Sequence, residues 1–143
     1  MHPFRKAVEA GEFADIEKLL ADDVVFTSPV VFKPYPGKAI TAAILRGVSR
    51  VFTDFEYVRE IADGRDHALV FKAKVGDKEI HGCDFLHMDE DGRIDDLMVM
   101  VRPLSAALAL SEAMGAQFEE IAREAAEAVQ AEGAAGAAGA AGA

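Results

Sequence analysis

A single change of hydrophobic period, near Phe55, most constrains how this chain can fold. Before that point, apolar residues mostly recur at every third or fourth position, as on one face of a helix. After it, they alternate with polar residues, as in strands with one buried face. Most helices therefore precede most strands. This segregation predicts an α+β domain rather than the alternating pattern of a doubly wound sheet.

The first half of the chain predicts three helices and one strand. Apolar stripes predict short helices after Pro3 and from Phe13, and a third helix over residues 40–52. The β-branched and aromatic run over residues 24–28 predicts a strand. Three prolines within residues 29–37 predict an ordered loop after it.

The second half predicts an antiparallel meander of four strands over residues 55–102. Its turns fall at residues 63–66, at Gly76-Asp77 and at residues 89–92, where glycine and aspartate cluster.

The C-terminal region divides into a helix and a tail. Pro103 and a spaced apolar stripe predict a last helix over residues 103–132. Residues 133–143 repeat Gly-Ala-Ala, and each glycine costs a helix about 1 kcal/mol, so we expect this tail to fray. A chain of 143 residues suits one hydrophobic core. We therefore predict one domain over residues 1–132, followed by a Gly/Ala tail.

Composition bounds the partners and the compartment. A formal net charge of −10 disfavours nucleic acid, whose binding depends on Lys and Arg side chains that neutralise phosphates. The apolar runs are far shorter than the ~20 residues that span a bilayer. The single cysteine, Cys83, cannot form an internal disulfide and fits a reducing compartment. We expect a cytoplasmic protein that binds neither nucleic acid nor membranes.

Motifs for metals and phosphates are incomplete. Residues 36–38 (Pro-Gly-Lys) lack the earlier glycine of a phosphate-binding loop, and residues 89–92 do not align with a calcium loop. His81, Cys83 and His87 share one face of a strand, but the two histidines lie about 20 Å apart at ~3.3 Å per residue. We predict no metal and no cofactor.

The strand register singles out one carboxylate. Pairing the strands across Gly76-Asp77 sets Leu69 opposite Asp84, and pairing them across the next turn sets Leu97 on its other side. Asp84 thus lies in an apolar patch, where desolvation should raise its pKa and make it a candidate site residue. The alternative is that Asp84 lies at an exposed curve or binds a loop backbone.

The opposite face of the meander is nearly as apolar, which is unusual for an antiparallel sheet with one face in water. It carries Val70, His81, Cys83, Phe85, Met98 and Met100. We predict a homodimer through this face. The alternative cover is the last helix, over residues 104–129.

The order of elements resembles the nuclear transport factor 2-like superfamily, which includes ketosteroid isomerases and SnoaL-like polyketide cyclases. The resemblance covers about residues 3–102, and its local signatures lie at residues 19–24, 36–38, 83–85 and 91–94. It implies a cone-shaped, curved antiparallel sheet wrapped around the N-terminal helices, with an apolar pocket inside. The pocket residues that we expect are Phe4, Phe26, Ser28, Leu69, Phe71, Gly82, Leu97 and Val99.

This sequence has only some of the catalytic residues that known enzymes of the superfamily use. Ungapped matching to ketosteroid isomerase places its protonated aspartate at Asp84, its base at Ser28 and its tyrosine at Phe4. Limonene epoxide hydrolases of this fold need an aspartate where Val99 stands. SnoaL-like cyclases use one aspartate in an apolar pocket, a role that Asp84 can fill.

Three functions therefore remain open. The first is an isomerase, cyclase or lyase that uses Asp84 as an acid or base on an apolar small molecule, with His67 or Tyr57 as a second group. The second is a non-catalytic binder of an apolar small molecule. The third is a dimeric protein-interaction module.

Overall fold

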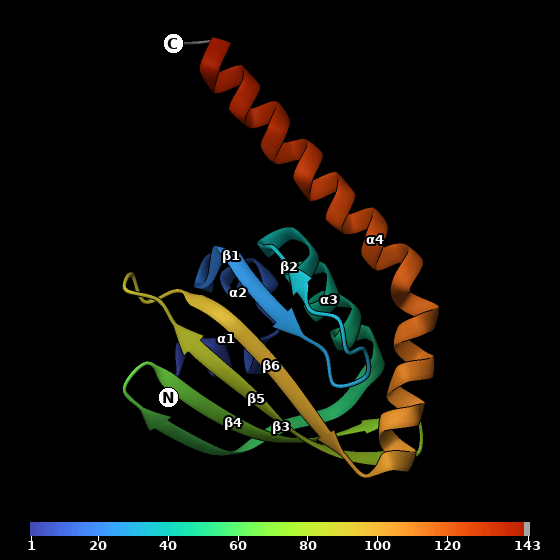
Figure 1. Ribbon diagram of the computed structural model, residues 1–143. Helices are drawn as coiled ribbons and strands as arrows, with labels where there is room; N and C mark the ends of the chain where they lie inside the picture. The colour runs from blue at the N-terminus through green and yellow to red at the C-terminus, as the bar shows by residue number, and fades with distance from the viewer. Residues whose placement is uncertain (142–143) are drawn as a thin grey trace.

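The computed structural model describes the backbone of residues 1–141 and the side chains of residues 1–131. Within them the chain forms four helices and one six-stranded sheet (Figure 1). The helices are α1 (Pro3–Ala10), α2 (Phe13–Leu19), α3 (Lys38–Val51) and α4 (Leu104–Ala141). The strands are β1 (Leu20–Thr27), β2 (Tyr35–Pro36), β3 (Phe52–Asp63), β4 (Asp66–Val75), β5 (Lys78–Met88) and β6 (Ile94–Arg102).

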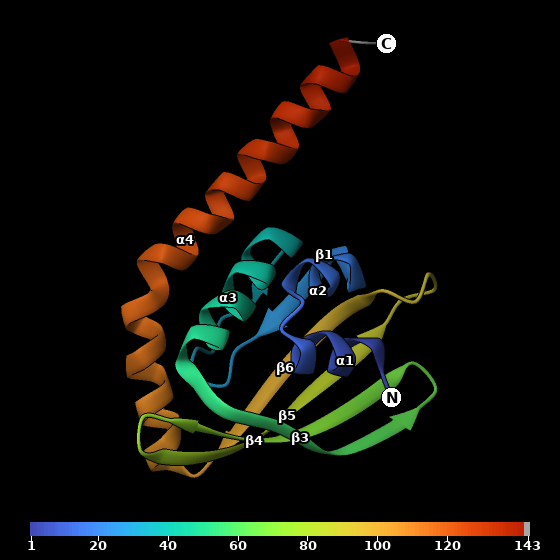
Figure 2. The same cartoon turned by 180° about the vertical axis from the view of Figure 1, so that it is seen from behind.

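The sheet has the strand order β2-β1-β6-β5-β4-β3 and curves around helices α1, α2 and α3 on one side (Figure 2). The predicted α+β class and the antiparallel meander from β3 to β6 are confirmed. Strand β1 pairs in parallel with β6, a partnership that we did not predict because the two strands are far apart in the sequence.

The short helix α1 is held by both of its ends. The Phe4 amide donates a hydrogen bond to Nδ1 of His2 over 3.0 Å, which caps the first turn. Gly11 ends the helix at a φ of 71°, a left-handed conformation that glycine adopts readily. These caps fix Phe4 and Ala7 against the inner face of the sheet, where both are buried.

The predicted register of β5 on β4 is confirmed, whereas the predicted register of β5 on β6 is wrong by two residues. Leu69 lies opposite Asp84, as predicted. Asp84 pairs with Val99 rather than Leu97, because Met88 pairs with Ile94 and an irregularity follows between His87 and Met88. A shift of two residues keeps every side chain on its predicted face. Asp84 therefore still points to the apolar inner side.

Helix α4 packs along α3 and then projects beyond the body of the protein (Figure 1). Its contact with α3 is close, because a Cβ placed on Gly47 would lie 2.6 Å from Cδ1 of Ile121. Arg46 of α3 also pairs with Glu124 over 2.9 Å. The helix continues to Ala141, where we expected fraying, because alanine favours a helix that has already formed. Residues 142 and 143 lie outside the described part.

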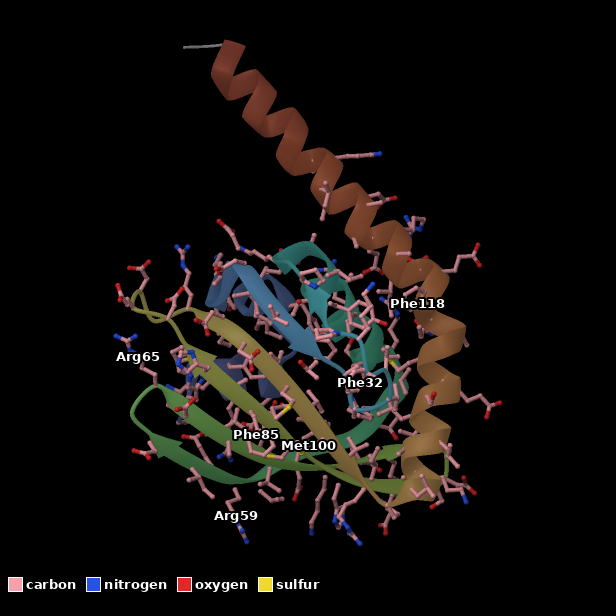
Figure 3. All side chains as sticks on the ribbon, in the orientation of Figure 1. Phe32, Arg59, Arg65, Phe85, Met100 and Phe118 are labelled. Carbon is pink, nitrogen blue, oxygen red and sulfur yellow. The ribbon has the colours of Figure 1, made fainter. Side chains whose placement is uncertain are left out.

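The outer face of the meander stays uncovered, so α4 is not the cover that we considered for it. Phe85 of β5 and Met100 of the neighbouring strand β6 lie on this face and are 37% and 53% exposed (Figure 3). Within the described part of the chain, none of the helices combines the length and the hydrophobicity that a membrane span requires.

Candidate functional site

A cavity of about 480 Å³ lies between helices α1, α2 and α3 and the inner face of β3 and β5. We call it the reactive chamber. Its lining is largely apolar, with Phe4 and Ile16 buried in its wall and Tyr57 and Asp84 buried at its floor. Its exposed residues, which include Glu9, lie at the end of α1 and on α3 and mark its mouth.

Asp84 and Tyr57 form a hydrogen-bonded pair in this chamber. The Tyr57 hydroxyl donates to Oδ2 of Asp84 over 2.6 Å, and the two residues are 6% and 7% exposed, respectively. Burial raises the pKa of Asp84 to about 7, although the hydrogen bond from Tyr57 acts in the opposite direction. Burial and the charge of Asp84 raise the pKa of Tyr57 well above its ordinary value. Near neutral pH, Asp84 therefore changes protonation state while Tyr57 stays protonated.

Aromatic side chains and an arginine hold Tyr57 in place. The ring of Phe55 meets the Tyr57 ring edge to face, with centroids 4.9 Å apart. Cζ of Arg5 lies 6.0 Å from the centroid of the Tyr57 ring, and the same guanidinium pairs with Glu9 over 2.9 Å. Helix α1 is thus fastened over the strand that carries Tyr57.

The predicted pocket residues divide into three groups. Phe4 lines the reactive chamber together with Asp84. Four others are buried in the packed interior and line neither this chamber nor the second cavity described below: Leu69, Phe71, Gly82 and Leu97. The ring of Phe71 packs directly against Gly82, where a Cβ would lie 2.2 Å from its Cζ.

The third group, Phe26, Ser28 and Val99, lines a second cavity of about 290 Å³ between the proline-rich loop, α3, β6 and α4. We call it the α4 chamber. The Ser28 hydroxyl accepts hydrogen bonds from the amides of Val30 (3.1 Å) and Val31 (3.3 Å), so it fixes the turn of the loop.

His67 lies apart from Asp84. Its ring packs against that of His2 with centroids 4.5 Å apart, and it lines neither chamber. Its Nδ1 is buried without a hydrogen-bond partner among the described residues. Of the two candidate second groups, the structure brings only Tyr57 to Asp84.

The sequence also matches a known protein family. Residues 2–97 match the SnoaL-like domain, which is more than half of the chain. The chain belongs to the SnoaL-like family. None of the curated proteins matches the sequence.

Solved structures of similar proteins support this SnoaL-like assignment. A bacterial protein with a cystatin-like fold from Silicibacter pomeroyi DSS-3 is 37% identical, with a TM-score of 0.80 over 85% of this chain and 86% of that one. A steroid delta-isomerase from Pseudomonas aeruginosa is 41% identical, with a TM-score of 0.78 over 82% and 87%. An NTF2-like protein from Cytophaga hutchinsonii ATCC 33406, 21% identical over 71% and 85%, shares the fold with a TM-score of 0.55. The predicted superfamily is confirmed.

The SnoaL-like match ends at residue 97, before α4 begins. The reactive chamber therefore belongs to the matched part of the chain, whereas the α4 chamber takes one wall from outside it. Among the described residues, no group of three or more His, Cys, Asp or Glu side chains is placed to hold a metal ion.

Sequence reasoning missed Glu9, an exposed residue of α1 that lines the reactive chamber. Its position gave no signal, because a polar residue near the end of an amphipathic helix is ordinarily solvated. Tyr57 gave a weak signal, since it alternates in phase with Phe55 and so faces the helices.

Proposed function

We propose that this protein binds an apolar carbonyl compound in the reactive chamber and catalyses proton transfer on it, as an isomerase or a cyclase. The observation that carries the proposal is the buried pair of Asp84 and Tyr57 at the floor of an apolar cavity. An acid–base catalyst works best when its pKa lies near the working pH, and burial brings the pKa of Asp84 to about 7.

Asp84 has a role in both directions of such a transfer. As a carboxylate it takes a proton from a carbon next to the carbonyl group, and the C–H electron pair forms an enolate. As a carboxylic acid it returns the proton to a different carbon, which moves the double bond and regenerates the carboxylate. Tyr57 donates its hydrogen bond to Asp84 and so orients the carboxylate towards the ligand.

The isomerase class has support from a relative. A protein described as a steroid delta-isomerase is 41% identical to this chain and overlaps 82% of it. The positions where ketosteroid isomerase has its base and its tyrosine hold Ser28 and Phe4, and Ser28 lies in the other chamber. The proposed chemistry therefore depends on Asp84 alone as the proton carrier, and Glu9 is the other acidic residue that lines the chamber.

Those same two replacements favour a second candidate function, a non-catalytic binder of an apolar small molecule. A site that lacks a separate base and a separate oxyanion donor retains its shape and its apolar lining. Binding alone needs no more than that.

The deciding experiment follows proton exchange in heavy water. Wild-type protein is incubated with a Δ5-3-ketosteroid and, separately, with 2-alkylcyclohexanones, and exchange of the protons next to the carbonyl group is followed by NMR. We expect exchange with wild type, loss of exchange with Asp84→Asn, and no change with the exposed control Asp96→Asn. If native mass spectrometry finds a retained small molecule and exchange stays absent, the protein is a binder.

We further propose that two copies associate through the outer face of the meander. The support is the cluster of apolar side chains left uncovered there, which includes Phe85 and Met100. We also propose a cytoplasmic location, supported by Cys83, which is a free thiol on the same face.

A further inference from the structure

The α4 chamber has an apolar lining and an apolar mouth. Its walls include the buried side chains of Phe26, Leu110 and Ile121, and none of the described residues that line it is charged. Phe118 on its rim is 46% exposed, and Phe32, on the loop that forms another wall, is 99% exposed (Figure 3). Exposed aromatic side chains beside an apolar cavity mark a surface that an apolar ligand can cover.

The two chambers are adjacent. Val48 and Phe52 line both of them, so the two chambers meet at these two side chains. The floors are also neighbours, because Asp84 in the reactive chamber pairs across the sheet with Val99 in the α4 chamber. Directly paired residues on one face of a sheet have Cβ atoms about 5 Å apart.

The polarity of the two chambers differs. The reactive chamber has two carboxyl groups, those of Asp84 and Glu9. The α4 chamber offers hydroxyl groups, such as those of Ser28 and Ser111, among apolar side chains. A ligand that fills both chambers therefore needs a polar end and an apolar end.

We propose that the two chambers form one ligand site, in which the reactive chamber holds a ring with a carbonyl or enol group and the α4 chamber holds an apolar tail attached to that ring. This inference rests on the proposed function for the position of the ring. It assigns to α4 the role of a wall that selects ligands by the length of their tail.

Binding of 4-alkylphenols, measured by calorimetry, tests the proposal. A phenol presents an enol-like hydroxyl on a ring, and the series from 4-ethylphenol to 4-hexylphenol varies only the tail. Burying each added methylene should lower Kd about fourfold until the α4 chamber is full. The n-alkanols of matching length report on the tail alone.

Gly115 provides the matched variant. It lines the α4 chamber, and a Cβ placed on it meets nothing within 4 Å, so a side chain there enters open space. Gly115→Leu should abolish the gain in affinity with tail length, so that 4-hexylphenol binds no more tightly than 4-ethylphenol. Gly115→Ala controls for the backbone, and Ala116→Leu places the same side chain on an exposed position that lines neither chamber.

The outcomes separate this inference from the proposed function. If phenols bind with no gain from tail length, or if Gly115→Leu leaves that gain intact, the shared site is overturned while the reactive chamber stands. If alkanols bind with a tail-dependent affinity that Gly115→Leu removes and phenols bind no better than alkanols, the tail chamber stands alone and the shared site is overturned. If neither series binds, the shared site is overturned, and proton exchange on the ketones decides the proposed function separately.

Discussion

Replacing Asp84 with asparagine should remove a large pH dependence from the stability of this protein. The pKa of Asp84 is raised from 3.8 to about 7 in the folded state. Three pKa units correspond to a difference on the order of 4 kcal/mol between the two protonation states. Because Asp84 is 7% exposed, solvent screens little of that difference. Its carboxyl therefore contributes strongly to the effect of pH on stability.

The sign follows from which state keeps the proton. Below about pH 4, Asp84 is protonated in both the folded and the unfolded chain, so its contribution to stability is fully present. Between about pH 4 and pH 7 the unfolded chain releases this proton and the folded chain retains it. The free energy of unfolding falls over that window. Above about pH 7 the folded chain also releases it, and the loss levels off.

Urea unfolding followed by circular dichroism suits a chain without tryptophan. The free energy of unfolding of Asp84→Asn minus that of wild type should rise between about pH 4 and pH 7, by on the order of 4 kcal/mol, and then stay level. Asp96→Asn, the same change at an exposed position of β6, should show no such rise. A difference that stays constant from pH 4 to pH 8 would refute the claim that Asp84 is buried in an apolar site.

Three further predictions test the neighbouring contacts. Tyr57→Phe removes the hydrogen bond that lowers the pKa of Asp84, so a carboxyl NMR titration should place that pKa higher than in wild type; a lower value would contradict the pairing. Gly47→Val should destabilise the protein by about 1–3 kcal/mol through a clash with Ile121, and adding Ile121→Ala should restore part of the loss in thermal unfolding. Met98→Lys places an unpaired charge on the outer face, which would cost an interface there several kcal/mol. The Met98→Lys variant should therefore be monomeric in sedimentation at micromolar concentration. A Met98→Lys dimer would mean that the copies meet elsewhere.

Local patterns sufficed for much of the fold. The two-residue turn at Gly76-Asp77 determines the register of β4 on β5, and every pair along that hairpin follows from it. The position of Asp84 on the inner face of the sheet follows from the same hairpin register. Period and turn chemistry act between near neighbours, so a sequence displays them directly.

Contacts between segments far apart in the sequence could not be predicted from local patterns. The pairing of β1 with β6 joins a strand that precedes the meander to the last strand of the meander. The pairing of Tyr57 with Asp84 depends on β3, whose register on β4 is interrupted between Thr53 and Glu56 and again between Tyr57 and Arg59. Each irregularity changes which residues meet, and no local sequence signal marks it. The position of α4 depends on the close approach of Ile121 to Gly47, two residues that are far apart in the sequence.

The energetics of Asp84 connect the fold to the proposed chemistry. A carboxyl that keeps its proton up to about pH 7 and, within the described part of the chain, accepts one hydrogen bond is poorly matched to its surroundings. An apolar pair of similar shape, such as leucine at 84 with phenylalanine at 57, would remove the desolvation cost and leave no buried hydroxyl unpaired. Packing therefore gives no reason for a carboxyl at this position. The proposed function does give one, because the property that makes Asp84 costly to fold, a proton held loosely at neutral pH, is the property that proton transfer to a ligand in the reactive chamber requires.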